Sequence, residues 1–492
     1  MQDSLGKIVT ITLCILVFIL NMDITVVNVA LPALGMLPGA TDDKLQWIVA
    51  AYALSAAVAV IPSGALLDRY GPRRVLAFST LLFGTASLLA ALSSSAMAVI
   101  ISRVIMGLGS SAILTGSIAT LTLYYQDRRK ARAFGIWSAC AAVGLSAGPL
   151  VGSWLLSVAN WKSIFLINVP LSLFAVVAVI RAVPASNSIN KNKIDFLSIS
   201  ALSLALLTGT AGLIEFGAGR VTSAIALAVL CLASLLFFMA RQRGAGPRLL
   251  DWETLRSGAM LVPLFVLVVL FTVMSILLFL LPASFELSTE TGSSASLYIL
   301  PLPLGIAVAA VLGGYALNKL SPNMIMGISL GTIAIGLLAV IPLDPSRPSL
   351  LVLSGLACVG LGVGIGQPVA LQTAVGAFSP GRRGVGSGFV NSLRLAANAL
   401  GAGIAGGTVS LMVSGASNSA GEKSLTEGAL SCRIIDATGK ALEADLCLAY
   451  TQGLKLVLAL ALVAVIAAAI AVVTWKRISQ TNHTAVTKTT IK

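Results

Sequence analysis

The stretch GALLDRYGPRRVL, residues 64–76, joins two long apolar runs at residues 46–67 and 75–95. A bilayer core takes about 20 apolar residues per helix, so each run is long enough to cross a membrane. The stretch between them holds four charged residues, and its glycines allow a tight turn and a close approach of helices. We therefore expect two membrane-spanning helices that meet in a charged loop at the membrane surface.

Similar apolar runs fill the rest of the chain. Of its 492 residues, 57% are hydrophobic and only 10% are charged, and the mean hydropathy is +0.97. This composition excludes an ordinary soluble domain, and the chain has neither the short alternating strands of a β-barrel nor the charged heptads of a coiled coil. We predict fourteen transmembrane helices near residues 8–31, 46–67, 75–95, 97–122, 133–157, 163–183, 195–216, 222–240, 260–282, 294–317, 324–342, 349–371, 384–413 and 451–475.

The basic residues are distributed unevenly between the loops. Most of the 32 Lys and Arg residues fall on one side of the predicted helices when both termini are placed in the cytoplasm. This asymmetry follows the positive-inside rule and requires an even number of spans. The net charge of +14 therefore reflects membrane orientation, and we expect no nucleic-acid partner.

Cysteines and histidine limit the possible chemistry. Four of the six cysteines lie in apolar runs, where they are small packing residues. Cys432 and Cys447 lie in the longest loop, about 415–450, on the predicted outer side, where thiols can be oxidised. We predict a disulfide between them, and a cell surface that is not oxidising would leave both free. The only histidine, His483, lies in the polar tail, so no metal site is expected.

Two polar breaks divide the chain. The stretch 184–194 follows the sixth apolar run, and a weaker break at 241–257 follows the eighth. Polar segments of this kind join separate parts of a fold. The predicted parts are a six-helix half at 1–183, a linker with two extra helices at 184–257, a second six-helix half at 258–475 that includes the outer loop, and a cytoplasmic tail at 476–492.

An internal repeat supports the two halves. The sequence at 64–69 is echoed at 314–319, and the basic cluster at 127–129 is echoed at 381–383. Repeats in register indicate that the two halves share one structural plan. Paired halves favour alternating access, in which a substrate site near the middle of the membrane opens to each side in turn.

The loop at 64–76 resembles the signature loop of the major facilitator superfamily, although Pro72 stands where a basic residue is frequent. Its carboxylate, Asp68, can pair with a basic group or accept hydrogen bonds from a helix N-terminus. The resemblance implies an all-α integral membrane protein with two six-helix pseudo-repeats and two additional central helices. It also implies a conformational role for Gly64, Asp68, Arg69, Gly71 and Arg73.

The fourth apolar run contains Arg103 within Arg103-Val-Ile-Met-Gly107. A buried arginine is costly and is usually a paired functional group, whereas an arginine near a helix end can extend to the interface instead. The run resembles the fourth-helix motif of the superfamily, in which the arginine is linked to proton transfer. Met106 replaces the more usual glutamine.

The fifth run resembles the antiporter motif of drug exporters. Gly144, Gly148 and Gly152 are spaced four apart, which makes a groove on one helix face, and Pro149 removes an amide donor and favours a bend. Ser153 stands in place of the motif's final glycine.

The first run contains Asp23, with Asn28 five residues later. A carboxyl group inside an apolar run favours neutralisation by a proton or an organic cation, and a structural hydrogen-bonding role is the alternative. This run and residues 160–170 resemble motifs of the fourteen-helix drug:proton antiporter family. The resemblance implies proton coupling through Asp23, with Arg103 as its modulator.

Weaker candidates lie elsewhere. Glu215 is a second possible proton-coupling residue, and Arg394 could balance Asp23, contact an anionic cargo or serve helix packing. Aromatic residues such as Tyr52 are more often core or lipid-facing residues than ligand contacts.

Two transport functions remain open. The first is proton-driven export of hydrophobic or cationic small molecules, as in multidrug efflux and antibiotic resistance. The alternative is uptake or facilitated transport of a sugar or organic anion. The chain lacks a phosphate loop, a metal-ligand cluster and a Ser/His/Asp set, so neither an enzyme nor an ATP-driven pump is expected. We expect no cofactor beyond the proton gradient, and a monomer in a bacterial plasma membrane.

Overall fold

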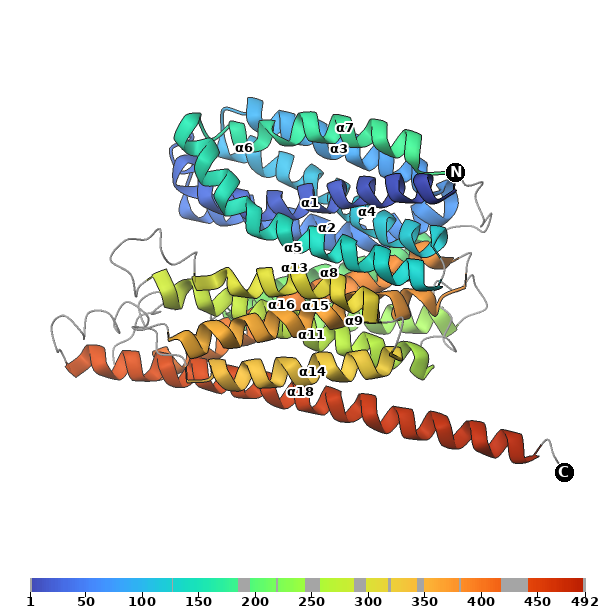
Figure 1. Ribbon diagram of the computed structural model, residues 1–492. Helices are drawn as coiled ribbons and strands as arrows, with labels where there is room; N and C mark the ends of the chain where they lie inside the picture. The colour runs from blue at the N-terminus through green and yellow to red at the C-terminus, as the bar shows by residue number, and fades with distance from the viewer. Residues whose placement is uncertain are drawn as a thin grey trace. The chain divides into compact units, whose positions relative to one another are not determined.

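The computed structural model describes residues 2–125, 127–184, 195–217, 220–243, 257–286, 298–316, 320–342, 349–379, 382–416 and 441–489 (Figure 1). Within these ranges the regular structure is entirely helical. Most helices are apolar over most of their length, as a chain that must satisfy its backbone hydrogen bonds inside a bilayer requires. The helices are α1 (Gln2–Leu34), α2 (Asp42–Tyr70), α3 (Pro72–Leu92), α4 (Ala96–Tyr124), α5 (Asp127–Val158), α6 (Ser163–Leu166), α7 (Asn168–Ala182), α8 (Phe196–Gly217), α9 (Val221–Arg243), α11 (Gly258–Glu286), α13 (Pro301–Ala316), α14 (Pro322–Val340), α15 (Leu350–Gly376), α16 (Arg383–Ala416) and α18 (Ala441–Thr489).

The helices coincide with the apolar runs of the sequence. Each of the fourteen predicted spans falls on one helix, except that the span at 163–183 is built from α6 and α7. Within the described residues, eleven helices are long and apolar enough to cross a membrane, and shorter apolar helices cover Leu197–Leu213 and Pro301–Gly313. The all-helical membrane fold is confirmed, whereas the count of fourteen spans stays a prediction.

By their internal contacts the helices group into two compact units. Unit 1 consists of Met1–Ala211, Leu227–Thr254 and Val375–Leu395, and unit 2 consists of Gly212–Ala226, Leu255–Ala374 and Ala396–Lys492. The division into halves at residues 183 and 257 stays a prediction.

In unit 1, small residues bring pairs of helices close together. Helix α2 packs along α4, and α1 packs along α5 (Figure 1). At Gly107 on α4, an added Cβ would overlap the Ser55 hydroxyl and the Tyr52 carbonyl of α2. At Gly144 on α5, it would lie 2.6 Å from the Phe18 carbonyl oxygen of α1. Glycine is therefore required at these crossings, because no larger residue permits the same approach.

A short interruption separates α6 from α7 and positions a polar side chain. Helix α6 ends at Leu166, and α7 begins at Asn168. The Phe165 carbonyl accepts a hydrogen bond of 2.9 Å from the Ser87 hydroxyl of α3. This bond holds α6 against α3, and Asn168, the first residue of α7, is fully buried inside unit 1.

Unit 2 uses the same kind of packing. Helix α18 packs against α11 and α14. On α14 and α15, Gly336 and Gly355 face each other, and a Cβ on either would lie within 2.8 Å of the other's carbonyl oxygen. The Ser275 hydroxyl of α11 donates a 2.6 Å hydrogen bond to the Asn398 carbonyl of α16. These contacts form a close-packed helical bundle in unit 2.

Candidate functional site

The polar centre of unit 1 is an ion pair between two helices. The Arg103 Nη1 atom of α4 lies 2.6 Å from the Asp23 Oδ2 atom of α1, and the side chains are 1% and 0% exposed. Asp23 is fully buried, so protein atoms surround its carboxylate. Arg103 therefore does not extend to the membrane interface, and that alternative is wrong.

Two further side chains complete the environment of the carboxylate. The Asn168 amide donates to the second Asp23 oxygen, Oδ1, at 2.7 Å, and to the Ser87 hydroxyl at 3.2 Å. Both carboxylate oxygens therefore accept a hydrogen bond from protein. The Asn168 Oδ1 atom is buried and has no hydrogen-bond partner among the described residues. The site thus contains one unused acceptor next to the carboxylate.

The guanidinium group of Arg103 is held by helix α2. Its Nε atom donates to the Ile48 carbonyl at 3.1 Å, and its Cζ atom lies 4.3 Å from the centre of the Tyr52 ring. A cation above an aromatic face is stabilised by the negative charge of the ring face. These contacts matter because a buried ion pair repays its desolvation only when its remaining donors and acceptors are also satisfied.

The resulting network joins five elements of unit 1, namely α1, α2, α3, α4 and α7. Removing a charge from either member leaves the opposite charge buried and unpaired. Adding a proton to Asp23 has the same effect on Arg103, because the neutral carboxyl no longer balances the guanidinium. The ionised pair therefore holds α1 and α4 together.

The antiporter-like face of α5 lies against the helix that carries Asp23. A Cβ on Gly148 would overlap the Thr25 hydroxyl, and one on Gly152 would lie 3.0 Å from Val26. The Thr25 hydroxyl donates to the Leu145 carbonyl at 3.1 Å. Pro149 lies inside α5. The motif thus sets the position of α1 near its carboxylate.

The loop at residues 64–76 contacts the beginning of α16. Asp68 accepts hydrogen bonds from the backbone amides of Gly384 at 2.7 Å and Val385 at 2.9 Å, which are residues of unit 1. Free amides and the helix dipole favour a carboxylate at this position. The Arg383 guanidinium, at the same helix start, donates to the Thr122 carbonyl at 3.1 Å. The predicted role of Asp68 as an acceptor at a helix N-terminus matches this geometry.

Glycines make that contact possible. A Cβ on Gly64 would lie 2.6 Å from the Gly384 carbonyl oxygen. Gly71 ends α2 with φ of 79°, a conformation that side chains disfavour, and Pro72 starts α3 directly after it. Arg69 is exposed, with its Cζ atom 5.6 Å from the centre of the Tyr70 ring. Arg73 is partly exposed in the first turn of α3.

The remaining candidates lie outside this network. Asn28 is exposed on α1. Glu215, in unit 2, pairs with Arg220 at 3.2 Å and accepts from the Ser223 hydroxyl at 2.7 Å, so its described partners belong to the turn between α8 and α9. Arg394 is partly buried on α16, and the described bonds of Asp23 go to other side chains. Cys432 lies outside the described residues, as does the side chain of Cys447.

The sequence profile of the Major Facilitator Superfamily matches residues 13–402. The chain belongs to this superfamily.

Relatives within the major facilitator superfamily are transporters. The chain is 31% identical over 408 residues to the uncharacterized transporter YebQ of Escherichia coli, which covers 81% of this chain and 87% of YebQ. It is also 31% identical to the drug efflux pump JefA of Mycobacterium tuberculosis, over 77% of this chain and 75% of JefA. The human organic anion transporter MFSD10 shares the fold with a TM-score of 0.61 at 15% identity, over 91% of this chain and 98% of that one. This major facilitator protein is therefore a transporter with a multi-pass membrane fold.

The sequence reasoning missed three residues of this major facilitator site. Tyr52, Ser87 and Asn168 contact the pair or its immediate partners, and none was selected. Asn168 lies within the stretch 160–170 that resembles a family motif, so a signal existed. Tyr52 and Ser87 lie in ordinary apolar runs, and only the packing of α2 and α3 reveals their role.

Proposed function

We propose that this protein is a proton-coupled antiporter that exports hydrophobic or cationic small molecules by alternating access. It acts as a monomer in a bacterial plasma membrane with both termini in the cytoplasm, and it requires no cofactor beyond the proton gradient. The observation that carries the proposal is the fully buried network of Asp23, Arg103 and Asn168. Its relative JefA is named a drug efflux pump, which favours the same class of cargo.

The coupling step follows from the network. With Asp23 ionised, the pair with Arg103 and the amide of Asn168 hold α1, α4 and α7 together. A proton that reaches Asp23 neutralises it, and the buried Arg103 then loses its counter-charge. Because an unpaired buried charge is strongly unfavourable, protonation shifts the equilibrium toward a conformation in which Arg103 is hydrated or paired elsewhere.

Substrate export then depends on competition between the substrate and the proton, which favour different conformations of the protein. A hydrophobic or cationic molecule that binds the conformation with ionised Asp23 opposes protonation, and proton binding opposes retention of the substrate. This reciprocity is required of any two ligands linked through one conformational equilibrium. The proton gradient therefore drives the substrate outward.

The test is flux in proteoliposomes with an imposed pH gradient. A fluorescent lipophilic cation such as ethidium should accumulate on the acidic side of the membrane, opposite to the flow of protons. Its addition should release protons, as measured with a pH-sensitive dye. Equal flux with and without the gradient would contradict coupling. Gradient-independent flux of a sugar or an organic anion would favour the alternative function, for which the fold of MFSD10 gives no specific support at 15% identity.

A further inference from the structure

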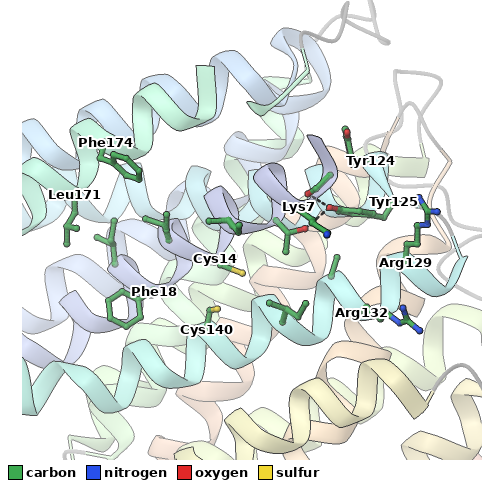
Figure 2. Close-up of a pocket in the computed structure, with 17 residues that line it drawn as sticks. Lys7, Cys14, Phe18, Tyr124, Tyr125, Arg129, Arg132, Cys140, Leu171 and Phe174 are labelled. Carbon is green, nitrogen blue, oxygen red and sulfur yellow. Dashed lines mark hydrogen bonds between the residues drawn. The ribbon is translucent and has the colours of Figure 1, made fainter. Parts of the chain in front are cut away.

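Two cysteines of unit 1 lie against each other across the packed helices α1 and α5. Cys14 of α1 and Cys140 of α5 both carry free thiols, and their side chains are hydrogen-bonded to each other. Figure 2 shows the two sulfur atoms facing each other between the helices. The sequence predicts separate packing roles for these residues, whereas their contact gives them a shared chemistry.

The contact continues the seam that the antiporter-like glycines form between α1 and α5. A Cβ added at Gly144 would lie 2.6 Å from the Phe18 carbonyl oxygen, and one at Gly148 would lie 2.8 Å from the Met22 carbonyl oxygen. Each step of four residues on α5 thus matches a step of four residues on α1, and the preceding step reaches the two cysteines. Close packing of two parallel helices therefore brings the thiols together.

The thiol pair lies in the wall of a cavity of about 1700 Å³ (Figure 2). Both cysteines line this cavity, and Cys140 is more exposed than Cys14, which is 8% exposed. The same wall includes the apolar side chains of Ile15, Phe18 and Ile136. Both helices are long and apolar enough to cross a membrane. Compounds that partition into apolar surroundings are therefore the ones that reach the pair most readily.

The surroundings favour oxidation of the two thiols over metal binding. Zinc sites in proteins use at least three protein ligands, and in the part of the chain that the structure describes no three His, Cys, Asp or Glu side chains could hold a metal ion together. Two thiolates would also place negative charge inside the membrane, which is costly. A disulfide carries no charge and requires only the two sulfur atoms.

We propose that Cys14 and Cys140 form a redox site that reacts with organic hydroperoxides and closes to a disulfide between α1 and α5. Cys140 reacts first because it is more exposed to the cavity. Its sulfur attacks the hydroperoxide, the O–O bond breaks, and Cys140 becomes a sulfenic acid while the oxidant takes the thiol proton and leaves as an alcohol. The Cys14 sulfur then attacks the sulfenic sulfur, and the hydroxyl group leaves with the Cys14 proton as water.

This sequence oxidises two thiols and reduces one hydroperoxide molecule. A soluble dithiol reverses it by thiol–disulfide exchange.

The experiment maps the bond in the purified full-length protein. The protein in detergent is treated with cumene hydroperoxide, unfolded, alkylated and digested without reductant, and the peptides are identified by mass spectrometry. We expect a linked pair of peptides that contain Cys14 and Cys140, and dithiothreitol should restore both thiols. Cys231, whose thiol donates to the Ala205 carbonyl at 3.2 Å, is the internal control and should remain a thiol. Absence of the linked pair, or a bond from Cys14 to a different cysteine, would overturn the proposal.

Two single variants test the order of the reaction. In Cys14→Ser, Cys140 should stop at the sulfenic acid, which dimedone traps. In Cys140→Ser, Cys14 should remain a thiol under the same treatment. The matched variant Cys231→Ser should form the bond as the wild type does. A dimedone adduct on Cys14 in place of Cys140 would show that Cys140 is not the attacking thiol.

A denatured sample tests whether the folded protein brings the pair together. Unfolding in sodium dodecyl sulfate before the oxidant is added should remove the preference for the linked peptides, because the two cysteines are far apart in the sequence. The same preference in the unfolded chain would contradict a pair that is positioned by the fold.

A steric variant tests access through the cavity. Ile136→Trp fills the cavity one turn from Cys140, and Leu173→Trp places the same ring at an exposed position of α7 that does not line it. Only Ile136→Trp should slow formation of the disulfide, at an unchanged thermal unfolding midpoint. Equal rates in the two variants would mean that the oxidant does not enter by the cavity, which would overturn this part of the proposal.

Discussion

Arg103 Nη1 lies 2.6 Å from Asp23 Oδ2 although the two residues are 80 positions apart in the sequence. Both side chains are buried, and Asn168 and Tyr52 occupy the remaining sides of the pair. Breaking a buried ion pair by removing one partner costs about 3–5 kcal/mol, because the other charge stays behind. In the proposed mechanism, stability and coupling depend on the same pair, so experiments must separate them.

Asp23→Asn should abolish gradient-driven export. The amide keeps the shape of the carboxyl group but cannot bind and release a proton. It also leaves Arg103 unpaired, so a lower unfolding temperature is expected. Substrate-induced proton release from vesicles, compared at equal protein abundance, is the measurement.

The double variant Asp23→Asn with Arg103→Gln is the matched control for folding. It removes both charges, so no unpaired charge stays buried, and the unfolding temperature should recover toward that of the wild type. Export should remain absent. Undiminished proton release in Asp23→Asn would move the coupling site elsewhere, with Glu215 as the next candidate.

Asn168→Ala should reduce export about 10-fold while the protein remains folded. The change removes a hydrogen bond to an ionised carboxylate, which contributes roughly 1.5–3 kcal/mol, and the bond to Ser87. As a positioning residue, Asn168 should alter the pH profile of export as well as its rate. Asn160→Ala, at an exposed residue of the loop before α6, is the control. A pH profile identical to that of the wild type would leave Asn168 a packing role only.

The sequence predicts the helices better than the contacts between them. Apolar length determines a span locally, so each predicted span falls on a helix or on the α6–α7 pair. The partner of a buried charge depends instead on the rotation and register of the helices. No local sequence pattern predicts these two properties. The sequence therefore links Asp23 to Arg103 only through the family resemblance, and it leaves Arg394 as another possible counter-charge for Asp23, because pairing cannot be read from spacing.

The loop at 64–76 is intermediate between these cases. The chemistry of Asp68 predicts an acceptor at a helix start, and the basic echo at 381–383 lies immediately before the amides of Gly384 and Val385 that it binds. Neither signal predicts that Asp68 binds the segment that follows residues 381–383. Only the close approach of Gly64 to Gly384 joins them.

Gly148→Ala should destabilise the contact between α1 and α5. The new methyl group would overlap the Thr25 hydroxyl and lie 2.8 Å from the Met22 carbonyl oxygen. Overpacking of this kind costs about 1–3 kcal/mol. Gly331→Ala on α14 is the matched control, because a Cβ there meets nothing within 4 Å, and the change should be neutral or stabilising by up to about 1 kcal/mol. Thermal unfolding in detergent measures both, and equal midpoints would contradict close packing at Gly148.

Acidification should weaken the start of α8. Burial opposes ionisation of Asp195, but the hydroxyl and amide of Ser198 and the guanidinium of Arg241 outweigh it and hold the Asp195 pKa below its ordinary value. Because the folded pKa is depressed, this stabilisation is full above the unfolded aspartate pKa of about 3.9 and is lost as the pH falls through the folded value. Protection from hydrogen exchange in the first turn of α8, taken relative to the intrinsic exchange rate at each pH, should therefore fall below about pH 4.

The matched variant for this pH dependence is Asp195→Asn. Its side chain can still cap the helix but cannot titrate, so exchange in the first turn of α8 should lose the acid-dependent step. An acid-dependent step of the same size in the variant would assign the effect to another group.

Asp68→Asn should slow export about 10-fold or more without preventing substrate binding. The carboxylate accepts from the amides of Gly384 and Val385 through separate oxygens. An Asn side chain has one oxygen, so its NH₂ group would face one of these amides and leave a donor unpaired at the start of α16. Hydrogen bonds to charged groups contribute roughly 1.5–3 kcal/mol, and their loss changes the balance between the conformation that contains this contact and any that lacks it.

The measurement is the rate of ethidium flux in proteoliposomes together with equilibrium binding of ethidium to the purified variant. Asp195→Asn is the control, since it makes the same isosteric change at the start of another helix, and its export rate should match that of the wild type. A larger carboxylate, Asp68→Glu, should not restore export, because a Cβ placed on Gly384 would already overlap the Asp68 carboxylate, which leaves no room for an added methylene. Wild-type flux in Asp68→Asn would show that the contact with α16 is not broken and remade during transport.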